Sequence, residues 1–85
     1  MLELRIFLDK KLIQRTVLSK GTITIGRSAD NDVVLANQHV SRLHAVLERA
    51  GEAFTVEDRS SNGLLLDGER VPRTSVLPPR CRLEI

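Results

Sequence analysis

Short stretches of the chain carry an apolar residue at every second position, which is the period of a half-buried β-strand. In residues 2–8 every even position is a leucine or an isoleucine. Alternation of this kind, or a short apolar run, predicts further strands over residues 12–18, 22–25, 33–35, 44–48, 54–58, 64–66, 70–71, 75–77 and 82–85. No window of about ten residues carries the apolar stripe of an amphipathic helix. The pattern therefore predicts an all-β fold of two packed sheets, a β-sandwich.

Polar and glycine-containing segments separate several of these strands. Asp9-Lys10-Lys11 predicts a turn that joins the first two strands into a hairpin. Asp67-Gly68 and Asn62-Gly63 are typical of tight turns, because these residue types accept positive φ angles. Neither an internal repeat nor a linker divides the chain. We therefore expect residues 1–85 to form a single domain with one small core.

The balance of charges excludes several classes of partner. The chain has 13 lysines and arginines against 11 aspartates and glutamates, an excess too small for a broad nucleic-acid or anionic membrane surface. It contains no tryptophan or tyrosine, so it lacks the aromatic platform on which single-stranded nucleic acids stack. Any preference for an anion must therefore come from a local arrangement of side chains.

Cysteine content and hydropathy favour a cytoplasmic location. The single cysteine, Cys81, has no partner for an internal disulfide. No apolar run approaches the roughly 20 residues that would span a bilayer. Residues 1–8 mix charged with apolar side chains, so they are not typical of a signal peptide.

Three polar loops, each after a predicted strand, hold the candidate chemistry. They contain Gly26-Arg27, then Ser41 three residues before His44, and then Ser60-Ser61-Asn62-Gly63. Their order and spacing resemble those of the forkhead-associated (FHA) domain family, whose pattern is Gly-Arg, Ser-x-x-His and Ser-x-Asn-Gly. The resemblance covers nearly the whole chain. It implies a β-sandwich whose loops at one end bind a phosphothreonine-containing peptide.

The resemblance also implies a role for individual residues. Arg27 would pair with the phosphate, and the Ser41 hydroxyl would donate to a phosphate oxygen. Arg42 would offer another phosphate or peptide contact, Ser61 would lie near the phosphate, and Asn62 would bond the peptide backbone. Four further residues would support the loops: Gly26, His44, Ser60 and Gly63. No metal, cofactor or catalytic residue is implied, and the partner would be a protein that a Ser/Thr kinase has phosphorylated.

General chemistry supports such a receptor. A phosphothreonine carries about 1.5 to 2 negative charges and three acceptor oxygens, so it calls for a planar cation together with hydroxyl or amide donors from separate loops. Arginine suits this role better than lysine, because its rigid fork matches the phosphate geometry. These donors would accept phosphoserine equally well, so the preference for threonine rests on the resemblance.

The sequence departs from the family pattern near its C-terminal end. Leu64 and Asp67 replace a threonine and an asparagine that are common in the family. Arg80-Cys81 replaces a Gly-Asp pair usual before a late strand. We therefore expect the last family strand to be missing, so that either the strand lies beyond Ile85 in a longer chain or another chain completes the sheet.

Other functions fit the sequence less well than phosphopeptide binding does. Gly21 to Ser28 differs from a nucleotide-binding P-loop only by an arginine in place of the lysine, but it lies in a predicted strand with no helix after it. Ser41, His44 and Asp58 are the residue types of a hydrolytic triad, but such residues occur by chance in most chains, and no Gly-x-Ser-x-Gly elbow is present. His44 is more typical of a hydrogen-bonded structural residue, and His39 of an exposed one. A scaffold domain that binds partners without phosphate is the main alternative.

Overall fold

The computed structural model describes residues 2–18 and 21–85, and all of its regular elements in that part of the chain are β-strands. The strands are β1 (Leu2–Leu8), β2 (Lys11–Leu18), β3 (Thr22–Gly26), β4 (Val33–Val34), β5 (Ala45–Ala50), β6 (Ala53–Asp58), β7 (Leu65–Leu66), β8 (Glu69–Arg70), β9 (Thr74–Leu77) and β10 (Arg80–Glu84). The predicted all-β architecture is confirmed. Among the described residues, no helix has the length and apolar character needed to cross a membrane.

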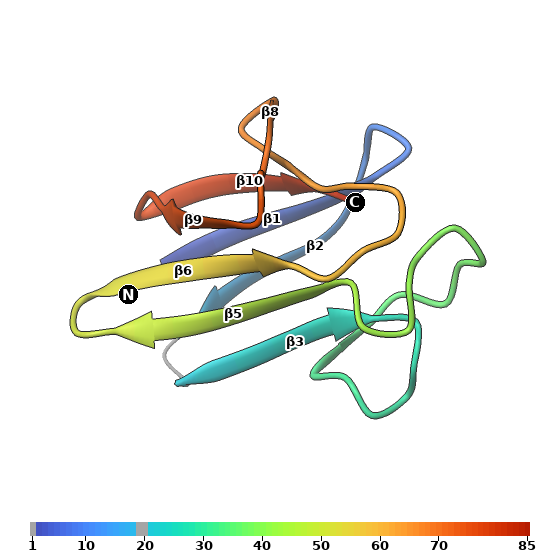
Figure 1. Cartoon of the computed structure of the whole chain (residues 1–85), viewed down its shortest axis with the longest axis horizontal. Helices are drawn as coiled ribbons and strands as arrows, with labels where there is room; N and C mark the ends of the chain where they lie inside the picture. The colour runs from blue at the N-terminus through green and yellow to red at the C-terminus, as the bar shows by residue number, and fades with distance from the viewer. Residues whose placement is uncertain (1, 19–20) are drawn as a thin grey trace.

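The strands form two five-stranded sheets. Sheet A has the order β2-β1-β10-β7-β8, and sheet B has the order β4-β3-β5-β6-β9. Figure 1 shows β3, β5 and β6 of sheet B in front of β1, β2 and β10 of sheet A. Because the chain changes sheets after β2, after β6 and again around β9, loops from both sheets gather at the ends of the sandwich.

The alternating pattern of the sequence buries one face of each sheet. In β1, Leu2, Leu4 and Ile6 are buried while Arg5 is exposed. The inward side chains of both sheets form a single core, which is the usual way for a two-layer domain to bury its apolar faces. The largest fully buried members of this core are Leu2, Leu4, Ile6, Ile25, Val40, Leu47, Val56, Leu64, Val71, Cys81 and Leu83.

Strand β2 forms as predicted but contributes little to the core. Leu12, Ile13 and Val17 are 48%, 43% and 55% exposed, because β2 is the outermost strand of sheet A. The β1–β2 register also shifts between Ile6 and Phe7. A residue period of two identifies a strand, but it does not tell an outer strand from a central one.

Two of the predicted turns have the expected backbone. Asp67 and Gly68 have φ angles of 48° and 86°, the positive pair that a two-residue hairpin between β7 and β8 requires. Asp9 and Lys10 likewise have positive φ, 51° and 64°. Asn62-Gly63 lies in the loop that connects β6 of sheet B to β7 of sheet A rather than in a hairpin, and of the two residues only Gly63 has positive φ.

The C-terminal strand lies inside sheet A. Strand β10 pairs in parallel with β1 and antiparallel with β7, so neither of its sides is an open edge. Arg80-Cys81, expected to precede this strand, forms its first two residues. That another chain supplies a missing strand stays a prediction. Cys81 is buried, and burial raises the pKa of its thiol to about 11, as expected of a packing residue rather than a nucleophile.

The P-loop alternative finds no support in this fold. Thr22–Gly26 is a strand between β4 and β5. Because a P-loop is a flexible turn that opens a helix, Gly21 to Ser28 cannot wrap phosphates in that way.

Candidate functional site

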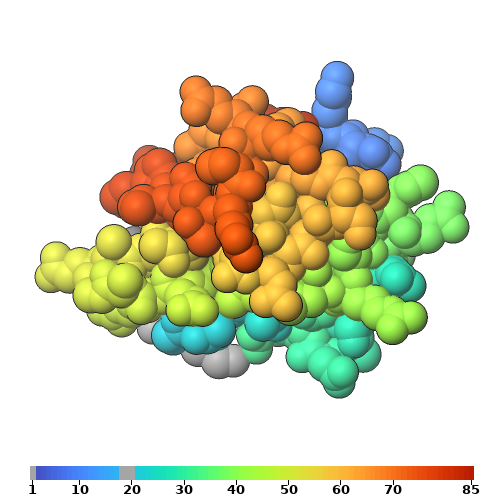
Figure 2. Space-filling model, in the orientation of Figure 1, coloured from blue at the N-terminus to red at the C-terminus, as the bar shows by residue number. Residues whose placement is uncertain are grey.

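Three loops far apart in the sequence meet at one end of the sandwich. They connect β3 to β4 (residues 27–32), β4 to β5 (residues 35–44) and β6 to β7 (residues 59–64). Figure 1 shows them together at the right of the molecule, and in Figure 2 the green surface near residue 40 lies beside the yellow-orange surface near residue 60. The predicted convergence of the three motifs is therefore present.

Gly26 brings the first loop against the second. The backbone amide of Arg27 donates to the Ser41 carbonyl at 3.0 Å, and the amide of Ser28 donates to the Arg42 carbonyl at 3.2 Å. A Cβ atom on Gly26 would lie 2.2 Å from the Arg42 carbonyl oxygen. Only glycine therefore permits this approach of the two backbones.

Asn31 fastens the same contact, and the sequence motifs did not reveal it. Its side-chain amide donates to the carbonyl oxygens of Ser28 and Arg42, at 2.9 Å and 2.7 Å. It thereby uses both of its N–H groups to join the first loop to the second. The sequence shows only an asparagine in a polar loop, and this does not by itself indicate a contact with the second loop.

His44 connects the second loop to the third. The backbone amide of Ser41 donates to His44 Nδ1 at 3.1 Å, and His44 Nε2 lies 3.3 Å from the Gly63 carbonyl oxygen. Since Nδ1 accepts a hydrogen bond, the ring proton is on Nε2, which donates to Gly63. The imidazole is 1% exposed. It therefore holds the loops from beneath, as a support rather than a ligand.

This geometry favours the neutral imidazole. Burial lowers the pKa of His44, and this effect outweighs the Gly63 hydrogen bond and the nearby Asp58 charge, which act in the opposite direction. A proton added to Nδ1 would face the Ser41 amide and remove that hydrogen bond.

We expect the free energy of unfolding to fall in acid because of His44. The unfolded chain has the ordinary histidine pKa of about 6.5, whereas the folded chain has a lower one. As the pH falls, the unfolded state takes up the proton first. The contribution of His44 to the free energy of unfolding is therefore full above the unfolded pKa and is lost as the pH falls through the folded pKa. Urea denaturation between about pH 5 and 7.5 measures this slope.

Two substitutions isolate the effect. His44→Gln should lower stability at neutral pH by about 1 to 3 kcal/mol, since buried donors and acceptors lose their partners, and it should flatten the pH dependence. His39→Gln, which removes an exposed histidine, should leave the slope unchanged. An equal slope in wild type and His44→Gln would contradict this assignment.

The third loop presents three further polar residues. The Ser61 amide donates to Ser41 Oγ at 3.0 Å, and the Asn62 side-chain amide donates to the His39 carbonyl at 3.3 Å. Beneath them, Ser60 Oγ accepts from the Gly63 amide at 2.8 Å and donates to Asp58 at 2.5 Å. Because the Ser41 oxygen accepts from Ser61, its own proton remains free to donate outward.

Two arginines border the same surface. Arg27 Nε donates to the Val40 carbonyl at 3.0 Å, which fixes the stem of the guanidinium and leaves its terminal nitrogens available. Both Arg27 and Arg42 are exposed. Within residues 2–18 and 21–85, neither one forms an ion pair with a carboxylate. Their charges are therefore not compensated locally.

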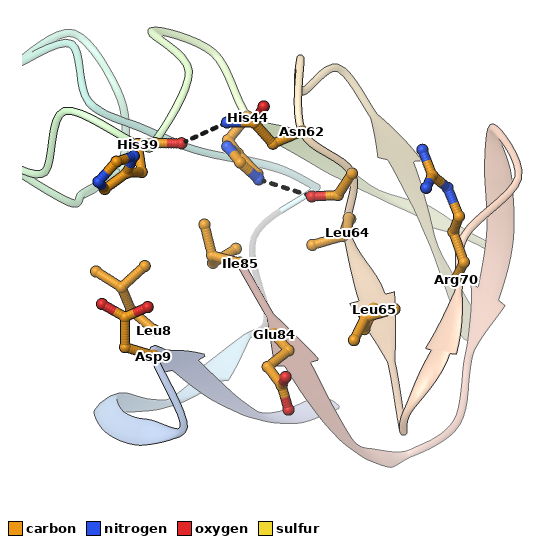
Figure 3. Close-up of a pocket in the computed structure, with 11 residues that line it drawn as sticks. Leu8, Asp9, His39, His44, Asn62, Leu64, Leu65, Arg70, Glu84 and Ile85 are labelled. Carbon is orange, nitrogen blue, oxygen red and sulfur yellow. Dashed lines mark hydrogen bonds between the residues drawn. The ribbon is translucent and has the colours of Figure 1, made fainter.

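A hollow of about 300 Å³ opens beside Asn62. Figure 3 shows His39 and Asn62 in the upper part of the view, Arg70 at the right, Leu8 at the lower left and Ile85 near the centre. The hollow thus combines apolar walls with charged and amide groups at its rim. The motifs gave no signal for it, because it is built from β1, β10 and the β6–β7 loop together.

The arrangement suits an anion with several acceptor oxygens. All five residues expected to be ligands lie on the three converging loops, with all four expected supports beneath or between them. The site has two guanidinium groups, which are cationic hydrogen-bond donors. A serine hydroxyl and an amide side chain add neutral donors. Among the described residues, no group of three or more metal-binding side chains is present.

Comparison with known proteins agrees with this geometry. The sequence pattern of the FHA domain matches residues 23–85. The FHA domain-containing protein FhaB of Mycobacterium tuberculosis is 37% identical over 65 residues, which cover 75% of this chain and 42% of FhaB. The transcriptional regulatory protein EmbR of the same organism is 44% identical over 55 residues, which cover 64% of this chain and 14% of EmbR. This chain thus spans a minor part of the length of both relatives.

Solved structures are similar as well. A structure of Mycobacterium tuberculosis EmbR in complex with a low-affinity phosphopeptide superposes with a TM-score of 0.75, at 38% identity over 80% of this chain and 18% of that one. A structure from a study of phosphothreonine-dependent FHA domain interactions has a TM-score of 0.67, at 27% identity over 76% of this chain and 68% of that one.

Proposed function

Because this chain belongs to the FHA domain family, we propose that it is a non-enzymatic module that binds phosphothreonine-containing segments of partner proteins. Arg27 and Ser41 bind the phosphate together with Ser61, Arg42 contacts either the phosphate or the peptide, and Asn62 holds the backbone of the peptide. Binding would recruit a partner after a Ser/Thr kinase has phosphorylated it. The module acts as one unit over residues 1–85 and works in the cytoplasm.

One observation carries this proposal. Ser61 donates to the Ser41 hydroxyl oxygen at 3.0 Å, across twenty positions of sequence, beside an Arg27 whose stem is fixed on Val40. The hydroxyl proton and the arginine terminus are thus left as donors on two loops that meet at one end of the sandwich. Positive charge and neutral donors from separate loops are what a phosphate monoester requires.

The energetics predict a reversible interaction. Each charge-assisted hydrogen bond to the phosphate is worth roughly 1.5 to 3 kcal/mol, while ordering an extended peptide offsets much of the sum. The supports lie within the chain itself, because His44, Asn31 and Ser60 hold the loops through hydrogen bonds to neighbouring loop residues. Little further loss of loop freedom is needed on binding.

Similar proteins support the choice of ligand. EmbR has been captured with a phosphopeptide, and the second similar structure belongs to work on phosphothreonine-dependent interactions. The hollow beside Asn62 gives room for a side chain of the bound peptide next to the modified residue. The residues that flank the phosphothreonine would therefore contribute to the choice of partner.

Peptide libraries test this function. Oriented libraries with a fixed phosphothreonine, phosphoserine or unmodified threonine are passed over the immobilised wild-type chain. We expect retention of phosphothreonine peptides above phosphoserine peptides and no retention of unmodified ones. Equal retention of all three classes would refute phosphate recognition and would favour the scaffold alternative.

A further inference from the structure

Three arginines lie side by side across the outer face of sheet A. Arg15 of β2 is paired in register with Arg5 of β1, and Arg5 is paired in register with Arg82 of β10. We call these three residues the arginine row. Leu4 and Ile6, which flank Arg5 in β1, are buried in the core. Because side chains alternate along a strand, Arg5 and the arginines beside it point away from sheet B. The arginine row is therefore separate from the loops of the proposed phosphothreonine site.

The row is only partly neutralised. Arg82 lies 3.0 Å from Glu84 and stacks over the Phe7 ring with its guanidinium carbon 3.8 Å from the ring centre. Arg5 and Arg15 are exposed, and neither is ion paired within the described residues. Like charges directly opposite each other on neighbouring strands destabilise a sheet. Two arginines in register without ion-pair partners therefore lower the stability of sheet A. Stability of the fold thus gives no reason for their presence.

Protection of the sheet edge does not account for the row. An outer strand such as β2 is often guarded by a charge that discourages pairing with other chains, and Arg15 alone could serve that purpose. Arg5, however, lies on the neighbouring strand, where no edge needs guarding. Val17 and Leu12, meanwhile, remain 55% and 48% exposed on the strand that should be protected.

The outer side chains of β2 present an ordered pattern to any strand added there. In the register with β1, Val17 lies opposite Glu3, Arg15 opposite Arg5, and Leu12 opposite Phe7. The outward side chains of β2 along the edge of sheet A are therefore apolar at Val17, basic at Arg15 and apolar again at Leu12. A strand that pairs with a sheet edge makes backbone hydrogen bonds and sets alternate side chains beside those of the edge.

From this pattern we propose that the β2 edge binds an extended acidic segment of a partner protein. Its central carboxylate lies over Arg15 and Arg5, and its apolar side chains, two positions away on either side, cover Val17 and the exposed pair Ile13 and Leu12 at the register shift. The segment needs no phosphate. Complementary charge selects it, and strand pairing fixes its direction and register.

A protein segment fits this surface better than a nucleic acid or a membrane. The basic side chains form a single row bordered by apolar ones and by the Arg80–Glu3 ion pair, rather than a continuous positive field. Phe7, the aromatic residue on this face, is covered by Arg82 and cannot stack with a base.

The test is an NMR titration of ¹⁵N-labelled protein with the unphosphorylated peptide Glu-Val-Thr-Glu-Thr-Leu-Glu, up to millimolar concentration. We expect shifts of β1 and β2 amides and none in the three loops of the phosphothreonine site. The double variant Arg5→Gln/Arg15→Gln should weaken binding at least tenfold. It should also melt no lower than wild type, since like-charge repulsion is relieved. The charge-matched control Arg49→Gln/Arg73→Gln should bind as wild type does.

Several outcomes would overturn the proposal. They are the absence of β2 shifts at millimolar peptide, equal binding by the double variant, and equal binding of a peptide with lysine in place of each glutamate. Stronger shifts of the same amides by a single-stranded oligonucleotide or by phosphatidylglycerol vesicles would overturn the choice of occupant. Binding of phosphothreonine peptides to the double variant is measured separately, so this proposal and the proposed function can fail independently.

Discussion

Arg27→Ala is expected to weaken binding of a phosphothreonine peptide by roughly 100-fold or more. The substitution removes a cation and up to two charge-assisted hydrogen bonds, each worth about 1.5 to 3 kcal/mol, and about 1.4 kcal/mol corresponds to tenfold in affinity. It also removes the Nε donor that holds the Val40 carbonyl. Fluorescence polarisation of a labelled peptide at fixed salt measures the change, because exposed charges are screened as salt rises.

Two further variants separate charge from geometry. Arg27→Lys keeps the charge but not the planar fork, so we expect an intermediate loss. Arg49→Ala removes the same charge at the far end of β5, where Arg49 bonds the Gly51 carbonyl, and it should bind like wild type. If Arg49→Ala lost as much affinity as Arg27→Ala, overall charge rather than this pocket would govern binding.

Gly26→Ala is expected to disrupt the site and to destabilise the whole domain. The new methyl carbon would lie 2.2 Å from the Arg42 carbonyl oxygen and 2.8 Å from its carbon, both backbone atoms that cannot rotate away. The first two loops must then separate, which breaks the bonds of Arg27 to Ser41 and of Ser28 to Arg42. Overpacking of this kind costs typically about 1 to 3 kcal/mol, measured by urea denaturation.

The chain provides a matched control for this substitution. Gly21 lies just before the same strand, and a Cβ added there meets no atom within 4 Å. Gly21→Ala should therefore change stability by less than about 0.5 kcal/mol and leave peptide affinity intact. Equal stability of the two alanine variants would show that the close contact at Gly26 is not required.

The sequence predicted the sandwich because its strands have strong local signals, whereas the candidate site residues came from the resemblance of three motifs to the FHA family. Alternating apolar residues mark strands wherever one face is buried, as in β1. Gly26 and His44 are recognisable because each fills a role that few residue types can fill: a backbone approach without a Cβ, and a buried ring with one donor and one acceptor.

Other features have no local signal. Val40 and His39 act through their carbonyl oxygens, which every residue possesses, so no pattern of side chains reveals them. Asn31 resembles any loop asparagine until Arg42 is placed beside it. The exposure of Leu12 follows from the position of β2 in its sheet, which depends on pairing between distant segments rather than on the strand itself.

The parallel pairing of β1 with β10 bears on how the molecule is assembled. The hairpin of β5 and β6 can close from neighbouring residues, whereas the centre of sheet A joins Leu4 to Cys81. Ribosomal synthesis must therefore proceed through β10 before β1 gains its second neighbour. A topology dominated by such distant pairings belongs to the slow class of small domains, with refolding in milliseconds to seconds. Until then the nascent β1–β2 hairpin presents two unsatisfied edges to chaperones and to other nascent chains.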